Sequence, residues 1–172
     1  MGKRSDFERR KNDAYDTPFE PVKPLLRFLL PGTRFIEPCA GKGHLVNHLV
    51  TNGHQCIAAW DTHPRKGYIE KRDAITARTR RKDFKFITNP PWTRELLHPM
   101  IVNLSDQAPT WLLFDADWMH TRQATPYLPR CTLVVSVGRV KWIPGSEFTG
   151  KDNCCWYKFE KIKGPGPRFI GR

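Results

Sequence analysis

Apolar residues along the chain occur in two patterns that repeat in turn. Short continuous runs, bounded by Gly, Pro or Asp, are typical of buried strands, and longer runs with a period near 3.6 are typical of helices. The short runs predict strands at 33–38, 56–61, 84–88, 110–117, 131–142 and 154–161, with a weaker strand at 68–73. The longer runs predict helices at 19–32, 44–53 and 93–104.

Strands that alternate with helices predict an α/β fold with a doubly wound, mostly parallel sheet, here of seven strands. The last two strands have no helix between them, so we expect an antiparallel hairpin at one edge. With 172 residues, the chain has room for one ordinary domain, 1–172, with a basic N-terminal arm and a C-terminal tail from Lys161. Both ends are expected to be mobile.

Charge narrows the choice of partner. The chain has 29 Lys and Arg against 17 Asp and Glu, a net charge of +12, which favours a polyanion such as nucleic acid. A solvated basic surface without a partner is the alternative. Five cysteines without a CxxC pair predict a reducing compartment and no metal site. No apolar run is long enough for a membrane span, so a cytoplasmic protein is expected.

A glycine turn and three acids follow the predicted strands. In "FIEPCAGKGHL", Glu37 ends a strand, and Gly41 and Gly43 allow a ligand to approach the backbone before the next helix. Asp61 ends the next strand, where it could accept hydrogen bonds from a ribose diol or cap a helix. Asp73 could accept from an adenine amino group or serve as a cap. A phosphate-binding loop of the G-x-x-x-x-G-K-[ST] type is absent, which favours a nucleoside without phosphates.

The stretch "FKFITNPPWTRELL" has an unusual strand end. Pro90 and Pro91 lack N–H groups and keep the chain extended, so the carbonyl groups stay available as acceptors beside the Asn89 amide. With the Trp92 ring, these groups suit a flat ligand that carries an amino group. A proline-stiffened strand end with a core tryptophan is the structural alternative.

Together these residues resemble the class I S-adenosylmethionine-dependent methyltransferases, with their Rossmann-like sheet, and within them the N6-adenine DNA methyltransferases of phages and prophages. The resemblance rests on "YDTP", "EPCAGKG", the acid Asp61, and NPPW, and it covers nearly the whole chain. It implies cofactor contacts from Tyr15, Thr17, Pro18, Glu37, Pro38, Cys39, Ala40, Gly41, Gly43, Asp61 and Asp73. It implies catalysis by Asn89, Pro90, Pro91 and Trp92. "GRVKW" resembles the stretch that brings a second aromatic ring, Trp142, to the target base, with Phe148 and Trp156 as alternatives.

The resemblance also implies a mechanism. The Asn89 Oδ1 and the Pro90 carbonyl would accept the hydrogens of the adenine amine while its nitrogen takes the methyl group of S-adenosylmethionine. The base would be flipped out of a duplex or taken from a single strand, between Trp92 and Trp142. Phosphate contacts would come from the arm, the loop 78–82 and the tail. No separate target-recognition domain fits.

Three alternatives stay open. RNA is not excluded as the substrate. Methylation of glutamine side chains in proteins uses a similar tetrapeptide, because a carboxamide nitrogen presents the same lone-pair problem. A nucleic-acid-binding module without activity is the third, and it is disfavoured by the intact Asn89, Asp61 and glycine turn.

Overall fold

The protein folds around one eight-stranded sheet with the order β3-β2-β1-β4-β5-β7-β6-β8. The computed structural model describes residues 16–145 and 147–172, so Tyr15 and the rest of the N-terminal arm lie outside the described residues. The strands are β1 (Arg34–Glu37), β2 (Gln55–Asp61), β3 (Glu70–Lys71), β4 (Lys85–Thr88), β5 (Thr110–Asp115), β6 (Cys131–Arg139), β7 (Asn153–Phe159) and β8 (Arg168–Ile170).

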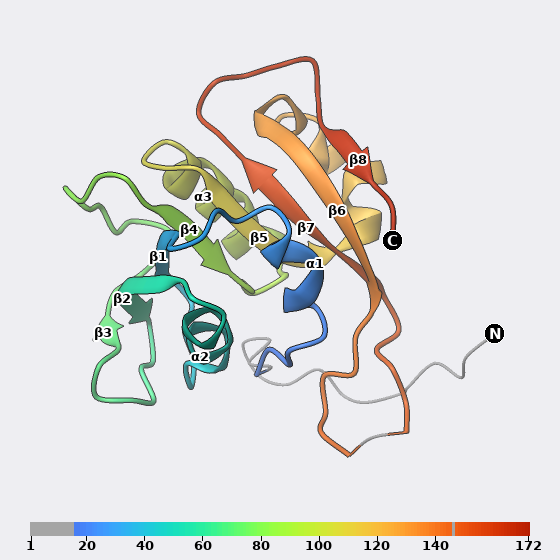
Figure 1. The fold of residues 1–172 in the computed structure, drawn as a ribbon. Helices are drawn as coiled ribbons and strands as arrows, with labels where there is room; N and C mark the ends of the chain where they lie inside the picture. Colours follow the sequence, from blue (N-terminus) through green and yellow to red (C-terminus); the bar gives the residue numbers. More distant parts are fainter. Residues whose placement is uncertain (1–15, 146) are drawn as a thin grey trace.

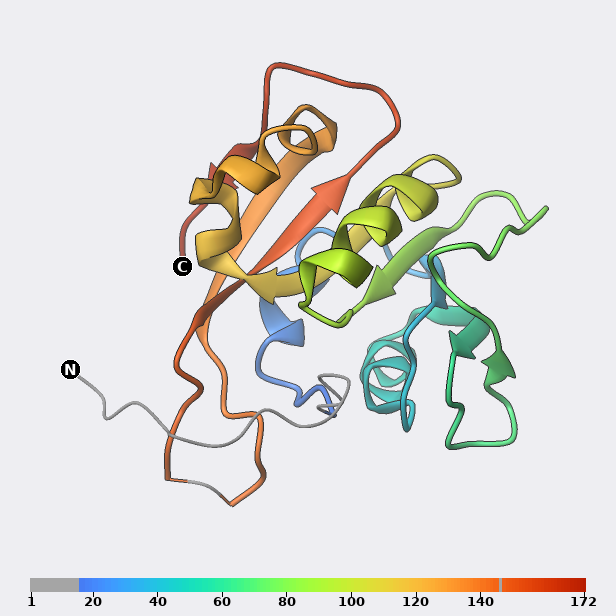
Figure 2. The ribbon, with the colours of Figure 1, turned by 180° about the vertical axis from the view of Figure 1, so that it is seen from behind.

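Helices cover both faces of the sheet (Figures 1 and 2). The α-helices are α1 (Val22–Leu26), α2 (His44–Thr51) and α3 (Arg94–Ser105), and the 3-10 helices are η2 (Ala116–His120), η3 (Arg122–Ala124) and η4 (Leu128–Arg130). Successive strand residues point to opposite faces. In β5, Trp111 and Leu113 therefore pack in the core that α1 and α2 cover, whereas Leu112 and Phe114 pack in the core of α3 and η2. This two-sided burial confirms the doubly wound fold.

The strand order reverses between β1 and β4, which are parallel neighbours in the middle of the sheet. Strands continue from β1 toward β2 and β3 on one side and from β4 toward β5 on the other. At such a switch point, the connections leave the carboxyl ends in opposite directions and leave a crevice between them. The glycine turn after β1 and the NPPW stretch after β4 both begin at this crevice, as the sequence predicts.

The predicted sheet is confirmed except for its strand count. The strand count is eight rather than seven, because the C-terminal tail forms β8, which pairs in parallel with β6. The predicted antiparallel hairpin is present at that end of the sheet, where β7 lies between β5 and β6 and the added strand β8 covers β6. The physical reason is that β6 would otherwise expose a row of unpaired backbone groups, which the tail satisfies while Ile170 packs against the core.

Candidate active site

The glycine turn after β1 has the backbone geometry that its glycines predict. Gly41 has φ of 54° and Gly43 has φ of 81°, both in the left-handed region that other residues rarely adopt. No atom lies within 4 Å of the position that a Cβ of Gly41 would take, so a ligand can approach the backbone there. A Cβ on Gly43 would collide with the Tyr68 hydroxyl, which lies over the turn. The turn is therefore open at Gly41 and covered at Gly43.

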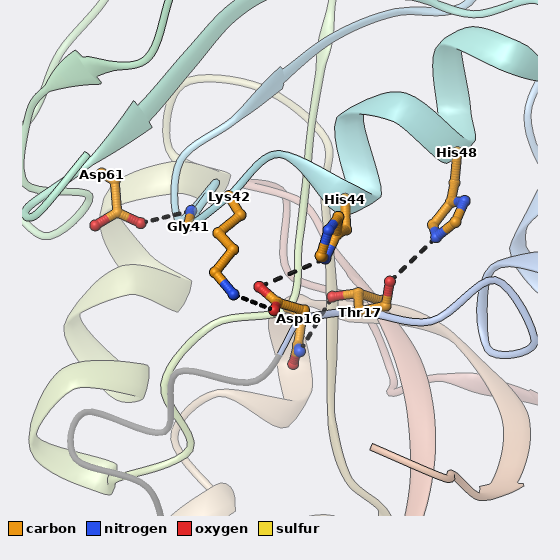
Figure 3. Close-up of polar contacts among 8 residues, drawn as sticks. Asp16, Thr17, Gly41, Lys42, His44, His48 and Asp61 are labelled. Atoms are coloured by element: carbon orange, nitrogen blue, oxygen red, sulfur yellow. Dashed lines mark hydrogen bonds and ion pairs between the residues drawn. The ribbon is translucent and has the colours of Figure 1, made fainter. Parts of the chain in front are cut away.

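Asp61, the last residue of β2, fastens the turn to the neighbouring strand. Its Oδ2 accepts a hydrogen bond from the Gly41 N–H at 2.8 Å (Figure 3), and its Oδ1 accepts from the His63 N–H at 2.7 Å. A carboxylate oxygen has two lone pairs, so both oxygens keep capacity for a ribose diol. Asp61 thus closes the turn at His63 and holds Gly41, without a helix to cap in the described stretch between β2 and β3, and it remains available as a ligand group.

Glu37, the last residue of β1, is a buried carboxyl with an unsatisfied atom. The side chain is only 2% exposed, and its Oε2 has no hydrogen-bond partner among the described residues. Burial raises the pKa of Glu37 well above its ordinary value, a hydrogen bond from the Val46 N–H partly opposes this, and the Asp61 charge adds to it. An unpartnered buried carboxyl beside an open turn is suited to a cationic ligand group.

The other predicted cofactor residues lie around the same turn. Burial raises the pKa of the Cys39 thiol, and the charges of Asp61, Glu37 and Asp73 raise it further. The Cys39 Sγ lies 3.9 Å from the Met100 Sδ, on the α3 side of the sheet. Pro38 and Ala40 are also buried.

Asp73 closes a turn and does not cap a helix, since none of the helices in the described part of the chain lies between β3 and β4. Its Oδ1 accepts a hydrogen bond from the Ile75 N–H at 2.8 Å, and its carbonyl accepts from the Ala77 N–H at 2.7 Å. The residue is exposed. Its role toward an adenine ring stays a prediction.

The segment Asp16–Thr17 joins the glycine turn to the NPPW stretch. Asp16 accepts from the Lys42 ammonium at 3.0 Å and lies 3.5 Å from the His44 ring nitrogen (Figure 3). The buried Thr17 hydroxyl accepts a hydrogen bond from the Asn89 Nδ2 at 3.3 Å. Thr17 of the "YDTP" segment and Asn89 of the NPPW stretch, 72 residues apart in the sequence, are therefore in direct contact. Pro18, the next residue, is half-buried.

Asn89 follows β4 directly and has both ends of its amide engaged. Its Nδ2 donates to Thr17, and its Oδ1 accepts from the Trp92 indole N–H at 3.3 Å. The two prolines delay the helix, since α3 begins only at Arg94. Pro90 is buried, and Pro91 and Trp92 are half-buried. The Asn89 oxygen keeps one free lone pair, so its orientation is fixed while it can still accept from a ligand.

The Trp142 ring contacts Trp92 from the β6–β7 loop. The ring centroids are 5.9 Å apart and the planes meet at 80°. Perpendicular rings cannot sandwich a base, so the predicted sandwich requires one ring to turn. Of the alternatives, Phe148 is 43% exposed, whereas Trp156 is fully buried and donates its N–H to the Pro21 carbonyl at 2.7 Å. Trp156 is a core residue and is removed from the candidates.

Sequence reasoning missed several polar residues of the site. Asp16 could have been recognised, because it lies within the "YDTP" motif. His48 and Tyr68 could not, since the His48 Nε2 reaches the Thr17 carbonyl at 3.2 Å and Tyr68 covers Gly43 only after α2 and the loop have folded. Asp115 at the end of β5 lies 3.8 Å from Arg94, and burial raises the pKa of this carboxyl.

Two absences concern the described part of the chain. Within residues 16–145 and 147–172, no group of three or more His, Cys, Asp or Glu side chains is placed to share a metal ion. None of the helices in these ranges has the length and hydropathy needed to cross a membrane.

Comparison with known proteins supports the fold. No family model and no curated protein sequence matches the chain. An RNA methyltransferase of provisional assignment from Pyrococcus horikoshii is similar with a TM-score of 0.65 at 16% identity, over 93% of this chain and 94% of that one. A dimethyladenosine transferase from Plasmodium falciparum is similar with a TM-score of 0.57 at 16% identity, over 87% of this chain and 62% of that one. The M protein of the type I restriction enzyme EcoKI is similar with a TM-score of 0.52 at 11% identity, over 89% and 47%. The chain has the Rossmann-like fold of these methyltransferases.

Proposed function

We propose that the protein transfers a methyl group from S-adenosylmethionine to the N6 amino group of adenine in DNA. The observation that carries this proposal is the contact between Thr17 and Asn89 at the switch point of a methyltransferase fold. It joins a strand-end amide to a segment whose preceding residue, Asp16, pairs with Lys42 in the glycine turn. A plain proline-stiffened strand end would not need a buried threonine directed at its amide.

The described residues fit this cofactor. The Glu37 carboxyl has a buried oxygen without a partner, which suits the ammonium group of the methionine moiety. The open backbone at Gly41 allows close approach, and Asp61 has spare acceptor capacity for the ribose. When bound, the cofactor supplies an electrophilic methyl group on a sulfonium.

The protein's own groups would prepare the amine for attack. The adenine amino nitrogen is a poor nucleophile because its lone pair is delocalised into the ring. Acceptance of its two hydrogens by the Asn89 Oδ1 and the Pro90 carbonyl localises that pair and stabilises the positive charge that forms on nitrogen. The bonds to Thr17 and Trp92 fix the amide, so little reorganisation is needed during the reaction. On transfer, the S–CH3 bond would break to leave S-adenosylhomocysteine, and the methylated nitrogen would lose one proton to water. No tuned general base is therefore required.

Nucleic acid is favoured as substrate by the charge of +12. DNA is the first choice because the motif set resembles N6-adenine DNA methyltransferases. RNA is the second candidate, because similar folds include a dimethyladenosine transferase and a protein assigned to RNA methylation. Protein glutamine is the third, since Asn89 and Pro90 would address a carboxamide nitrogen in the same way.

The test is transfer of a labelled methyl group to DNA, RNA and cell protein in parallel, with the product identified by mass spectrometry. Asn89→Ala should lower transfer by about 10²–10³-fold while cofactor affinity is largely kept, the loss typical of one preorganised transition-state contact. Asn47→Ala, an exposed asparagine on α2, is the matched control and should transfer like wild type. Wild-type rates in Asn89→Ala, or a product methylated on cytosine, would overturn the mechanism.

A further inference from the structure

A concave surface lies at the amino ends of the parallel strands, whereas the glycine turn follows the carboxyl end of β1. The surface is a groove of about 680 Å³ between the segments that lead into β1, β4 and β5. Leu30 and Pro31 line it before β1, Arg81 and Lys82 before β4, and Pro109 before β5. We name this surface the amino-edge groove, because parallel strands begin there.

The amino-edge groove is strongly positive. Its lining includes four basic residues and one acid, Asp83. The basic residues are Arg34, Arg81, Lys82 and Lys85. In the described ranges 16–145 and 147–172, no ion pair joins any of these four side chains to a carboxylate. The Arg34 guanidinium instead donates to the backbone carbonyl of Lys82 at 3.4 Å, which holds Arg34 beside the loop that carries Arg81 and Lys82. Unpaired cations that converge on one groove attract an anion with several charges.

The loop that supplies Arg81 and Lys82 is fastened to α3 and its end. Asn103, only 6% exposed, donates its Nδ2 to the Ala74 carbonyl at 2.8 Å and to the Ala77 carbonyl at 3.0 Å. Gln107 accepts from the Thr79 N–H at 3.0 Å and donates to the Ala77 carbonyl at 3.1 Å. A buried asparagine used to hold a surface loop indicates that the loop conformation matters, since these polar groups need partners when they are buried. The cations are thus presented on a fixed backbone.

We propose that the amino-edge groove binds the sugar-phosphate backbone of the nucleic acid substrate, at nucleotides away from the one that is methylated. This inference rests on the proposed function, from which it takes nucleic acid as the class of substrate. The four residues of β4 separate the groove from Asn89 by about 13 Å at about 3.3 Å per residue. Phosphates in the groove therefore belong to a flanking part of the same molecule.

A long polyanion fits the groove better than a small anion. The cations line an open surface rather than a closed pocket, and Arg34, Arg81 and Lys82 are all exposed. Leu30, which is 76% exposed, adds an apolar contact suited to a sugar. Such contacts with phosphates position a substrate without reading its sequence.

The test compares binding of two fluorescent DNA probes, about 4 and about 24 nucleotides long, each with the target adenine near its centre. At about 3.4 Å per charge the short probe extends only about 7 Å from the adenine, so only the long probe has phosphates that reach the groove. The groove variant is Arg81→Glu/Lys82→Glu. Arg81→Gln/Lys82→Gln removes the same two positive charges without adding negative ones, and it replaces the first variant if that one does not fold. The matched control is Arg27→Glu/Arg122→Glu, which makes the same change in net charge at exposed arginines after α1 and on η3, outside the groove lining.

We expect the groove variant to bind the long probe at least about 10-fold more weakly, with a salt slope reduced by about 2 for two lost phosphate contacts. Methylation of the short probe should stay at the wild-type rate, and the control should bind the long probe like wild type. Equal losses in the control and the groove variant, or an unchanged salt slope in the groove variant, would overturn this inference while leaving the proposed function intact. Failure of the wild-type protein to bind or methylate any nucleic acid would overturn both. Preferential binding of polyglutamate over DNA would also overturn the inference that the amino-edge groove binds nucleic acid.

Discussion

Replacement of Glu37 by glutamine tests whether the buried carboxyl is a ligand group or a structural one. The change keeps the size of the side chain and the acceptor for the Val46 N–H, and it removes only the ability to ionise. The structure predicts that the change stabilises the cofactor-free protein above about pH 4.5 but weakens cofactor binding. A residue with a purely structural role would not show both effects.

For the empty protein, the effect on stability depends on pH. Because burial raises the pKa of Glu37 in the folded state, its proton is kept to higher pH than in the unfolded chain, where the ordinary value is 4.5. The contribution of Glu37 to the free energy of unfolding is therefore fully present below about pH 4.5, and it is lost as pH rises through the pKa of Glu37 in the folded protein. Between the two values, the free energy of unfolding falls by about 1.4 kcal/mol per pH unit, or about 3–6 °C in Tm for a chain of this size. The glutamine variant lacks this loss.

For the cofactor, the same change removes a charged partner. A hydrogen bond to a charged group contributes about 1.5–3 kcal/mol, so the affinity for S-adenosylmethionine should fall by about 10–150-fold. Wild-type binding should also release a proton from Glu37, because a nearby ammonium lowers the pKa of a carboxyl, and Glu37→Gln should not.

Scanning calorimetry across pH and titration calorimetry in two buffers of different ionisation enthalpy measure both effects. Glu20→Gln, at an exposed site, is the control and should match wild type in both. Parallel pH profiles of Tm in wild type and Glu37→Gln, together with unchanged cofactor affinity, would refute the reasoning from the unpartnered oxygen.

Three further predictions follow from the site and the sheet. Asp61→Ala should weaken cofactor binding by about 1.5–3 kcal/mol, because the Gly41 anchor and a ribose acceptor are lost together; unchanged calorimetric affinity would remove Asp61 from the site. Trp142→Ala should weaken DNA binding by about 1–3 kcal/mol, the contribution of one stacked base, without changing cofactor affinity; steady-state kinetics with an oligonucleotide that carries adenine checks this. Deletion of residues 161–172 should lower the Tm, since it removes β8 and exposes the edge of β6, and an unchanged melting curve would show that β8 adds no stability.

The sequence predicted the architecture well because its strongest signals are local. Buried strands such as that of Trp111 to Phe114 are continuous apolar runs, and the punctuation by glycine and proline marks where they end. The same punctuation located the candidate site, since the glycine turn and the NPPW stretch are strand ends. The strand β8 was missed because its three residues lie in a Gly, Pro and Lys context, and its pairing depends on the free edge of β6, a tertiary property.

Contacts between side chains that are distant in the sequence could not be predicted either, because they too depend on the tertiary structure. Nothing in the spacing of Thr17 and Asn89 shows that they meet, yet their contact is what gives the tetrapeptide amide a defined direction. The Asp16 carboxylate, one residue earlier, is paired with Lys42 in the glycine turn. A short segment therefore connects the groups proposed for the cofactor with the group proposed for the target base. Because the Asn89 oxygen is useful only in one orientation, its preorganisation depends on residues that resemble a cofactor motif as much as on the prolines that follow it.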